Sequence, residues 1–283
     1  MKGIFNNTYL GARESSGPDD LVLLGCPLDA TSSFRGGTRF APESVRRASW
    51  TLETYSPYLK LDLEDVLFRD EGNLELRQGD LGYSLDLIES ASAGIAGRGG
   101  RALILGGEHL ITLPILKAVK GVHGPIQVIH FDAHCDLRDE YEGQKLSHAT
   151  VMKRVKELNG LEIASIGVRS GTRQEFGELV QAGSPHELAA RLKRTEPVYL
   201  TFDLDVFDPS LVPGVTTPEP GGLFFNEVME YFRVLQGMNI VGADIVELSP
   251  DYDTTFVSSI AAAKVAREIL MLMDLSKKGQ ARG

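Results

Sequence analysis

Side chains that could bind metal ions are concentrated in a few short strings of this sequence. The strings are GGEH, DAHCD and DLD, and one more acid stands in DIVELSP. In an extended segment, residues two positions apart point to the same side. We therefore expect the acids and the histidine of DAHCD to share one face, and the two acids of DLD to share another. The candidate metal ligands are His109, Asp132, His134, Asp136, Asp203 and Asp205, and the further acid is Glu247.

The chemistry of this set predicts bound cations. Five carboxylates and two imidazoles converging in one place would repel one another strongly unless cations neutralised them. A metal ion takes about four to six ligands. Six candidate ligands, with several carboxylates able to bridge, therefore predict two ions. Carboxylates and imidazoles without a thiolate favour Mn²⁺ over a cysteine-rich zinc site.

Short apolar runs precede these strings and alternate with helix-like segments. Each run is too short for a helix and is followed by Gly, Asp or Arg, which is typical of buried strands in a parallel sheet. This alternation predicts an open, doubly wound α/β sheet with helices on both faces, in which ligands bind beyond the carboxyl ends of the strands. No linker or repeat divides the chain, so we expect one domain over 1–283. The predicted strands are 21–24, 102–105, 126–131, 163–167, 198–202 and 240–243, and the predicted helices are 42–49, 84–98, 112–120, 147–158, 186–194, 225–236 and 256–273.

Each candidate residue, taken singly, has a structural alternative. A lone Asp after a strand is usually a helix N-cap or a turn residue. His130 lies inside an apolar run and is expected to be structural, and His123 and His186 lie in polar surroundings. Cys135 alternates away from the ligand face, which favours packing over metal binding. Three ligand-bearing strings at three successive strand ends, however, favour a metal site.

Composition narrows the class of protein. The 283 residues carry a formal net charge of −10 without a basic patch, which argues against nucleic acid as a partner and is compatible with a cationic substrate. No apolar run approaches the roughly 20 residues that span a bilayer. The N-terminus has no continuous apolar stretch of the secretory kind, and two cysteines give no disulfide framework. We therefore expect a cytoplasmic protein without a membrane partner.

Seven strings of the chain, in this order, resemble the ureohydrolase family, which contains arginase, agmatinase and formiminoglutamase. They are SSFRGGTRFAPESVR, LGGEH, HFDAHCDLRDEY, SHATVMKR, TFDLDVFDPSLVPG, TPEPGG and DIVELSP, and they run from about residue 20 to 270. Leu110, Cys135 and Thr216 depart from common variants of these strings without removing a ligand. The resemblance implies a three-layer α/β/α sandwich around a mostly parallel sheet, two Mn²⁺ per subunit, and a homo-oligomer, either a trimer or a hexamer.

The resemblance also implies a role for each candidate residue. His148, in SHATVMKR, matches the histidine that exchanges protons with solvent, and Glu247 matches the acid that holds the guanidinium group. Asp136 is expected to carry a proton to the departing amine. One Mn²⁺ would be held by His109, Asp132, Asp136 and Asp203, and the second by His134, Asp132, Asp203 and Asp205.

The segment 137–143, which follows the metal-binding string, suggests the substrate. It is acidic and lacks the Ser and Asn pattern with which arginases hold an amino acid, and the motifs are more similar to agmatinase. Asp139, Glu140 or Glu142 could attract the terminal amine of agmatine, or could equally belong to a solvated acidic loop, whereas Arg138 could meet a carboxylate. We expect hydrolysis of agmatine to putrescine and urea.

Other substrates and classes stay open from the sequence alone. N1-aminopropylagmatine, a longer polyamine, is a close rival to agmatine, and arginine, guanidinobutyrate and formiminoglutamate rank lower. A homologue without activity that regulates polyamine metabolism is a non-enzymatic alternative, which the intact ligand set disfavours. A zinc deacetylase of related fold is disfavoured because His109 and the second set of ligands are present.

Overall fold

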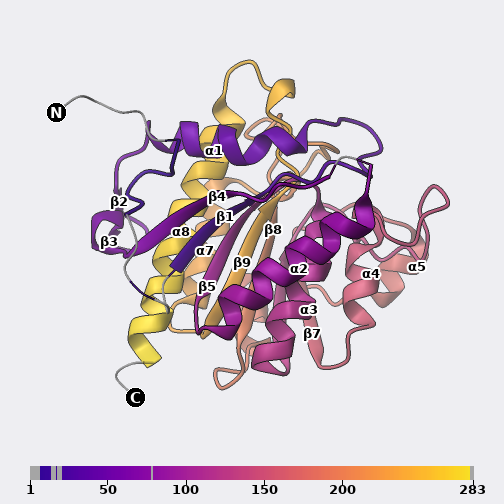
Figure 1. Ribbon diagram of the computed structural model, residues 1–283. Helices are drawn as coiled ribbons and strands as arrows, with labels where there is room; N and C mark the ends of the chain where they lie inside the picture. The colour runs from indigo at the N-terminus through magenta and orange to yellow at the C-terminus, as the bar shows by residue number, and fades with distance from the viewer. Residues whose placement is uncertain (1–6, 14–16, 18–20, 78, 281–283) are drawn as a thin grey trace.

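A seven-stranded sheet forms the centre of the computed structural model, which describes residues 7–13, 17, 21–77 and 79–280 (Figure 1). Its strands are β1 (Leu21–Cys26), β4 (Phe68–Asn73), β5 (Arg101–Gly106), β6 (Ile126–Phe131), β7 (Leu161–Ile166), β8 (Val198–Asp203) and β9 (Ile240–Val246). Every neighbouring pair in the sheet is parallel, and the spatial order is β4–β1–β5–β9–β8–β6–β7. A separate antiparallel pair joins β2 (Tyr55–Ser56) to β3 (Leu61–Asp62).

Helices cover both faces of this sheet, as Figure 1 shows. They are α1 (Ala41–Ser49), α2 (Leu81–Gly97), α3 (Thr112–His123), α4 (Val151–Lys156), α5 (Arg173–Glu178), α6 (Pro185–Arg191), α7 (Phe225–Leu235) and α8 (Val257–Gln280). The helices α1, α7 and α8 pack on one face, and α2, α3 and α4 pack on the other. The predicted three-layer α/β/α sandwich is therefore confirmed.

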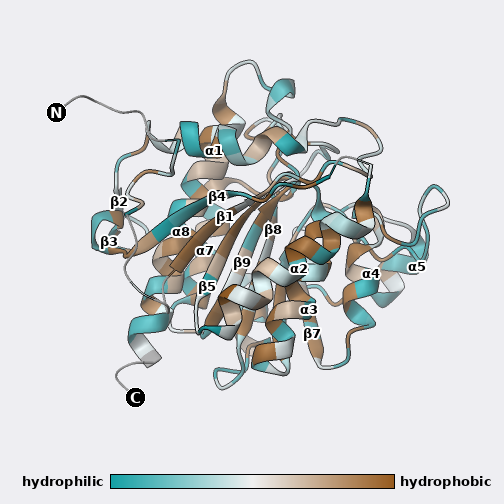
Figure 2. Ribbon diagram, viewed as in Figure 1, coloured by the Kyte–Doolittle hydropathy of each residue, from teal (hydrophilic) through white to brown (hydrophobic). Residues whose placement is uncertain are grey.

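Burial on both faces explains why the strands could be recognised as apolar runs. All residues of β1, β6, β8 and β9 are buried, and the centre of the sheet is largely brown, the colour of hydrophobic residues, in Figure 2. A strand covered on both faces has no solvent side to carry polar residues. The six predicted strands are all present, each within about three residues of its expected ends.

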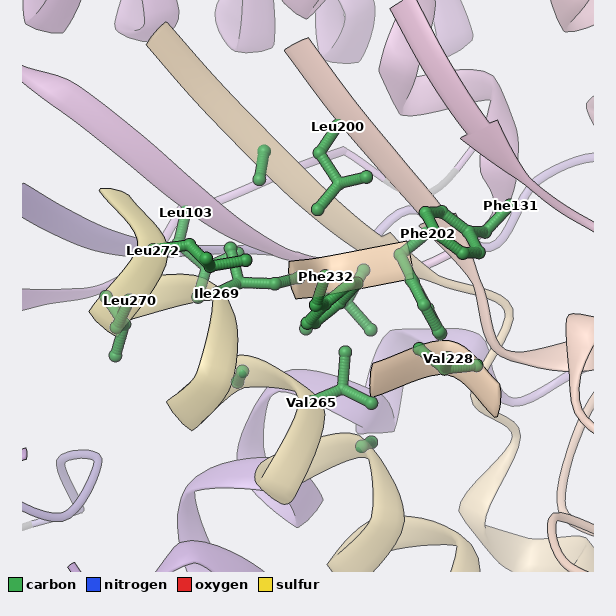
Figure 3. Packing of buried hydrophobic residues seen from close by; sticks show 14 of the residues in the cluster. Leu103, Phe131, Leu200, Phe202, Val228, Phe232, Val265, Ile269, Leu270 and Leu272 are labelled. Atoms are coloured by element: carbon green, nitrogen blue, oxygen red, sulfur yellow. The ribbon is translucent and has the colours of Figure 1, made fainter. Parts of the chain in front are cut away.

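The larger part of the core lies between the sheet and the helices α7 and α8 (Figure 3). Phe131 of β6 stacks on Phe202 of β8 with ring centroids 5.0 Å apart, and Phe232 of α7 meets Phe131 edge-on. Val265 and Ile269 of α8 pack into the same cluster. This packing fixes β6 and β8 side by side, which places the residues that follow them at one edge of the sheet.

Four of the described strands and α-helices were not predicted: the strand β4, the helix α5 and the antiparallel pair of β2 and β3. The strand β4 (FRDEGN) is polar because it forms one edge of the sheet, and its Asp70 accepts hydrogen bonds from the buried Arg46. The short helix α5 follows Thr172, whose hydroxyl accepts a hydrogen bond from the Glu175 N–H. The helix expected at 147–158 begins with a 3₁₀ turn over 148–150 and continues as α4.

No helix in the described ranges is both long and apolar enough to cross a membrane. Part of the N-terminal segment that we expect not to be a secretory signal, residues 1–6 and 14–16, lies outside the described residues.

Candidate metal centre and active site

Four neighbouring strands deliver the candidate ligands to one edge of the sheet. The strands β5, β9, β8 and β6 are consecutive in the sheet, and all run parallel. His109 follows β5, Asp132 follows β6, Asp203 ends β8, and Glu247 follows β9. Because the carboxyl ends of parallel strands lie at the same edge, residues far apart in the sequence meet there.

His109 forms the centre of the first cluster. Its Nδ1 atom lies 3.2 Å from the Oδ2 atoms of three buried acids, which are Asp132, Asp136 and Asp203. These are the four residues that the resemblance assigns to the first metal ion. The structure therefore brings the whole predicted set together.

The hydrogen bonds of His109 show which of its atoms is available as a ligand. Thr201 donates its hydroxyl hydrogen to Asp244, so the oxygen of Thr201 accepts from His109 Nε2 at 3.0 Å. In its neutral form, the imidazole then carries its hydrogen on Nε2 and presents a lone pair from Nδ1. Nδ1 is buried and has no hydrogen-bond partner among the described residues. The lone pair of Nδ1 and the three carboxylate oxygens could therefore all bind one cation placed between them.

The second cluster surrounds His134. Its Nδ1 lies 2.9 Å from Asp205 Oδ2 and 3.5 Å from Asp132 Oδ1. Asp132 thus turns Oδ2 toward His109 and Oδ1 toward His134, which is the disposition of a carboxylate that bridges two cations. Asp203 and Asp205 are linked as well, because Asp203 Oδ1 accepts the Asp205 N–H at 2.8 Å.

The ligands converge by turns of the chain, whereas we expected regular extended alternation. The strand β6 ends at Phe131, and Asp136 has a φ of 52°, in the left-handed region. Asp205 lies in a 3₁₀ turn that follows β8. Glu247 also has a positive φ of 66°. Such backbone conformations are uncommon for residues other than glycine and are concentrated at functional sites.

The site holds more negative charge than the protein alone stabilises. Burial raises the pKa of Asp203 well above its usual range, and the neighbouring Asp205 and Asp132 raise it further. Burial and Asp132 raise the pKa of Asp136 in the same direction. Burial alone would lower the pKa of His109, but the carboxylates of Asp132, Asp136 and Asp203 raise it well above its usual value. A cation bound in this cluster would therefore compete with protons.

The histidines and the cysteine outside the ligand set behave as expected. His130 is buried between Ser165 and Asp132, with its Nε2 2.8 Å from Asp132 Oδ2, so it orients a ligand. Cys135 packs in the core, and burial raises the pKa of its thiol to about 12. The lining of the cavity over the metal cluster, as the described residues form it, includes neither His123 nor His186.

A cavity of about 240 Å³ opens over both clusters. Glu247 lines it, and burial raises the pKa of this acid to about 7. Its Oε1 accepts the main-chain N–H of His109 at 2.5 Å, and its Oε2 accepts the hydroxyl of Thr216. His148, in the 3₁₀ turn before α4, lines the cavity too. All three residues with predicted catalytic roles, Asp136, His148 and Glu247, thus border one space.

At the far part of the cavity, the structure favours a solvated acidic loop over acids that line the site. Asp139, Glu140 and Glu142 are exposed and are not among the described residues that line the cavity, and Asp139 pairs with Arg154 at 2.7 Å. The chain turns back just after these residues through the Tyr141–Gln144 bridge. Arg138, Tyr141 and Glu175 line the cavity instead.

Arg138 and Glu175 give the far part of the cavity one positive and one negative side chain. Arg138 Nε lies 4.0 Å from Glu175 Oε2, and its guanidinium stands over the Tyr141 ring at 5.1 Å. Glu175 also accepts the N–H groups of Leu137 and Thr172. The sequence pointed to Arg138 but gave no role to Tyr141, although Tyr141 lies in the same segment. Glu175 could not be found, since nothing in the local pattern ties α5 to the metal-binding loop.

Comparisons with known proteins agree with this geometry. The model of the arginase family matches residues 19–272. The agmatinase of Halalkalibacterium halodurans is 39% identical over 94% of this chain and 98% of its own length. A guanidinobutyrase of Pseudomonas aeruginosa is 36% identical, over 90% of this chain and 86% of its own. The agmatine ureohydrolase structure of Thermoplasma volcanium superposes with a TM-score of 0.85 at 33% identity, covering 98% of this chain and 97% of that one. The chain therefore belongs to the arginase family, as its motifs predict.

Proposed function

We propose that this protein hydrolyses the guanidinium group of agmatine, giving putrescine and urea. The observation that carries the proposal is the pair of His–carboxylate clusters that share Asp132 and open into a cavity with the buried acid Glu247. The agmatinase and agmatine ureohydrolase relatives, matched over nearly their whole length, support agmatine as the substrate. The whole chain, 1–283, then acts as a single ureohydrolase domain.

The residues present fit two manganese ions. His109, Asp136 and the bridging Asp132 and Asp203 would hold one, and His134 with Asp205 and the same bridging acids would hold the other. The donor set of carboxylate oxygens and imidazole nitrogens suits Mn²⁺. When bound, such a pair of ions supplies Lewis acidity that activates water near neutral pH.

The protein's own side chains orient the substrate. Guanidinium is a planar cation, and Glu247 is a buried carboxylate whose main-chain and hydroxyl partners fix its orientation. A charge-assisted hydrogen bond from the guanidinium to Glu247 would position the reacting carbon over the clusters. This contact also replaces the water that the cation leaves behind when it enters the cavity.

Two further residues manage the proton that the leaving amine needs. The C–N bond breaks only if the departing nitrogen is protonated, since an amide ion is a very poor leaving group. Asp136 borders the cavity at the edge of the first cluster and would deliver this proton. His148, which is partly exposed, would exchange protons between the cavity and solvent.

A specific observation favours guanidinobutyrate as a second candidate. Among the described residues that line the cavity, Arg138 is the one basic side chain of the Lys/Arg type, and it could pair with a carboxylate at the far end of the substrate. The charge of Arg138 is partly balanced by Glu175, whose Oε2 lies 4.0 Å from Arg138 Nε. This balance weakens the repulsion that a substrate with a terminal amine would meet. N1-aminopropylagmatine would need the same environment and a longer channel.

A panel of guanidino compounds tests the proposal. We expect urea release from agmatine or N1-aminopropylagmatine to exceed release from arginine by at least about 100-fold in kcat/KM, or roughly 3 kcal/mol of transition-state discrimination. Faster turnover of guanidinobutyrate would favour the second candidate, and Arg138→Ala should then abolish that preference. Absence of urea from every compound in the presence of Mn²⁺ would leave the regulatory homologue as the better description.

We also propose that the protein is a cytoplasmic homo-oligomer, a trimer or hexamer, as the resemblance to its family implies. Light scattering should then give a mass that is a multiple of the 30.9 kDa chain. A mass near that of one chain would reject this.

A further inference from the structure

A buried acid that takes no part in the proposed reaction lies next to the metal cluster. Glu108, in the GGEH string, is fully buried. Its Oε2 accepts the main-chain N–H groups of Ala30 and Thr31, both at 2.6 Å, and its Oε1 accepts the hydroxyl of Thr31 at 2.8 Å. The three donors all come from the loop that follows β1. Glu108 thus holds one side chain, that of Thr31, in a fixed orientation.

Thr31 in turn contacts His148. The Thr31 Oγ1 atom accepts the main-chain N–H of His148 at 3.0 Å and lies 3.3 Å from the ring atom Nδ1. Because the hydroxyl hydrogen of Thr31 is donated to Glu108, its oxygen can only accept. The hydrogen between Thr31 and the imidazole must therefore belong to Nδ1.

We propose that Glu108 and Thr31 are positioning residues that hold neutral His148 as the Nδ1–H tautomer. The lone pair of Nε2 then faces the cavity side, where it lies 3.3 Å from the hydroxyl of Ser33. The ring edge also meets Tyr141, with centroids 5.7 Å apart, which limits its rotation. This inference rests on the proposed function, in which His148 exchanges protons with solvent.

The tautomer matters because only one ring nitrogen, Nε2, faces the cavity and can exchange protons with it. A proton picked up and released at Nε2 can pass to groups that line the cavity. The opposite tautomer would carry its hydrogen at Nε2 and leave the lone pair on Nδ1, which Thr31 shields. The chain Glu108–Thr31–His148 therefore acts as a hydrogen-bond relay of fixed direction, which prepares His148 for general acid–base work.

Three substitutions separate this role from a structural one. Thr31→Val keeps the shape of the side chain but removes the acceptor for Nδ1–H, and we expect kcat to fall about tenfold with KM changed less than about twofold. Thr31→Ser restores the hydroxyl and should recover most of the loss. Glu108→Gln places an NH₂ group against Thr31, whose hydroxyl would then turn toward Nδ1 and favour the opposite tautomer, so its kcat should resemble that of Thr31→Val.

Thr38→Val is the matched control. It makes the same replacement of a hydroxyl by a methyl group at the start of the 3₁₀ turn over 38–40, where the buried Thr38 hydroxyl donates to the carbonyl of Leu28 at 2.9 Å rather than to His148. Its effect on kcat should be small, which separates loss of the relay from loosening of the loop.

A double-mutant cycle with His148→Ala, measured as urea release by the manganese-loaded enzyme, decides the question. If Thr31 acts through His148, Thr31→Val should lower kcat in the wild-type background and change it less than about twofold in the His148→Ala background. Equal losses in both backgrounds, or a Thr31→Ser variant as impaired as Thr31→Val, would overturn the inference while the proposed function stands. A wild-type protein that releases no urea would remove the proposed function, and this inference with it.

Discussion

Replacing Glu247 by glutamine removes the charge of the proposed guanidinium site and leaves its shape nearly unchanged. The wild-type carboxylate accepts one hydrogen bond at each oxygen, from the His109 N–H and from the Thr216 hydroxyl. In the variant, the amide oxygen can keep the bond from His109, and the amide NH₂ can donate to Thr216, whose hydroxyl is free to rotate. The fold and the metal ligands should therefore be retained.

The size of the effect follows from the contact that is lost. A charge-assisted hydrogen bond is typically worth about 1.5–3 kcal/mol. At about 1.4 kcal/mol for each factor of ten, Glu247→Gln should lower kcat/KM for agmatine by roughly 10- to 150-fold. Steady-state urea release measures this, and elemental analysis of the same samples should find the manganese content unchanged. A variant that turns over normally, or one that loses its metal, would show that Glu247 has another role.

Three further predictions follow from the same site. Asp132→Ala should lose both manganese ions together with activity, whereas Asp205→Ala should keep close to one, and elemental analysis that finds two ions in the Asp132 variant would contradict the bridging role. Because the pKa values of His109 and His134 are raised in the metal-free protein, their protonated forms dominate near neutral pH and must lose protons when metal binds. Manganese affinity should therefore rise with pH, and calorimetry in buffers of different ionisation enthalpy should detect proton release; binding independent of pH would refute this. Gly107→Ala should lower the free energy of unfolding by about 1–3 kcal/mol or more, seen as a lower melting temperature, since a Cβ there would lie 1.8 Å from the Leu28 carbonyl oxygen. Gly94→Ala, with open space around it, should not.

The candidate metal ligands at the strand ends were the easiest residues to predict from the sequence. The strands β5, β6, β8 and β9 are buried on both faces, so their apolar runs mark where each strand ends and which polar residues follow. His109 and Asp132 could be placed together for this reason, although β5 and β6 begin 25 residues apart in the sequence. The edge strand β4 gave no such signal, because solvent on its outer side allows a polar sequence.

Contacts between distant loops could not be predicted. The pairing of Glu108 with Thr31, and of Thr31 with His148, depends on how three loops fold over the edge of the sheet, and no local pattern records it. The same limit applies to the acidic loop, whose two alternatives the sequence left open. Its charges suggested a site for an amine, but Asp139 pairs with Arg154 of α4 instead.

Manganese titration of the metal-free protein tests the central claim most directly. Bound ions per chain and the initial rate of urea release from agmatine should be measured on the same samples. The two-cluster geometry around Asp132 predicts that the rate reaches its maximum as the content approaches two ions per chain. Full activity at one ion per chain, or no urea at two, would contradict the account.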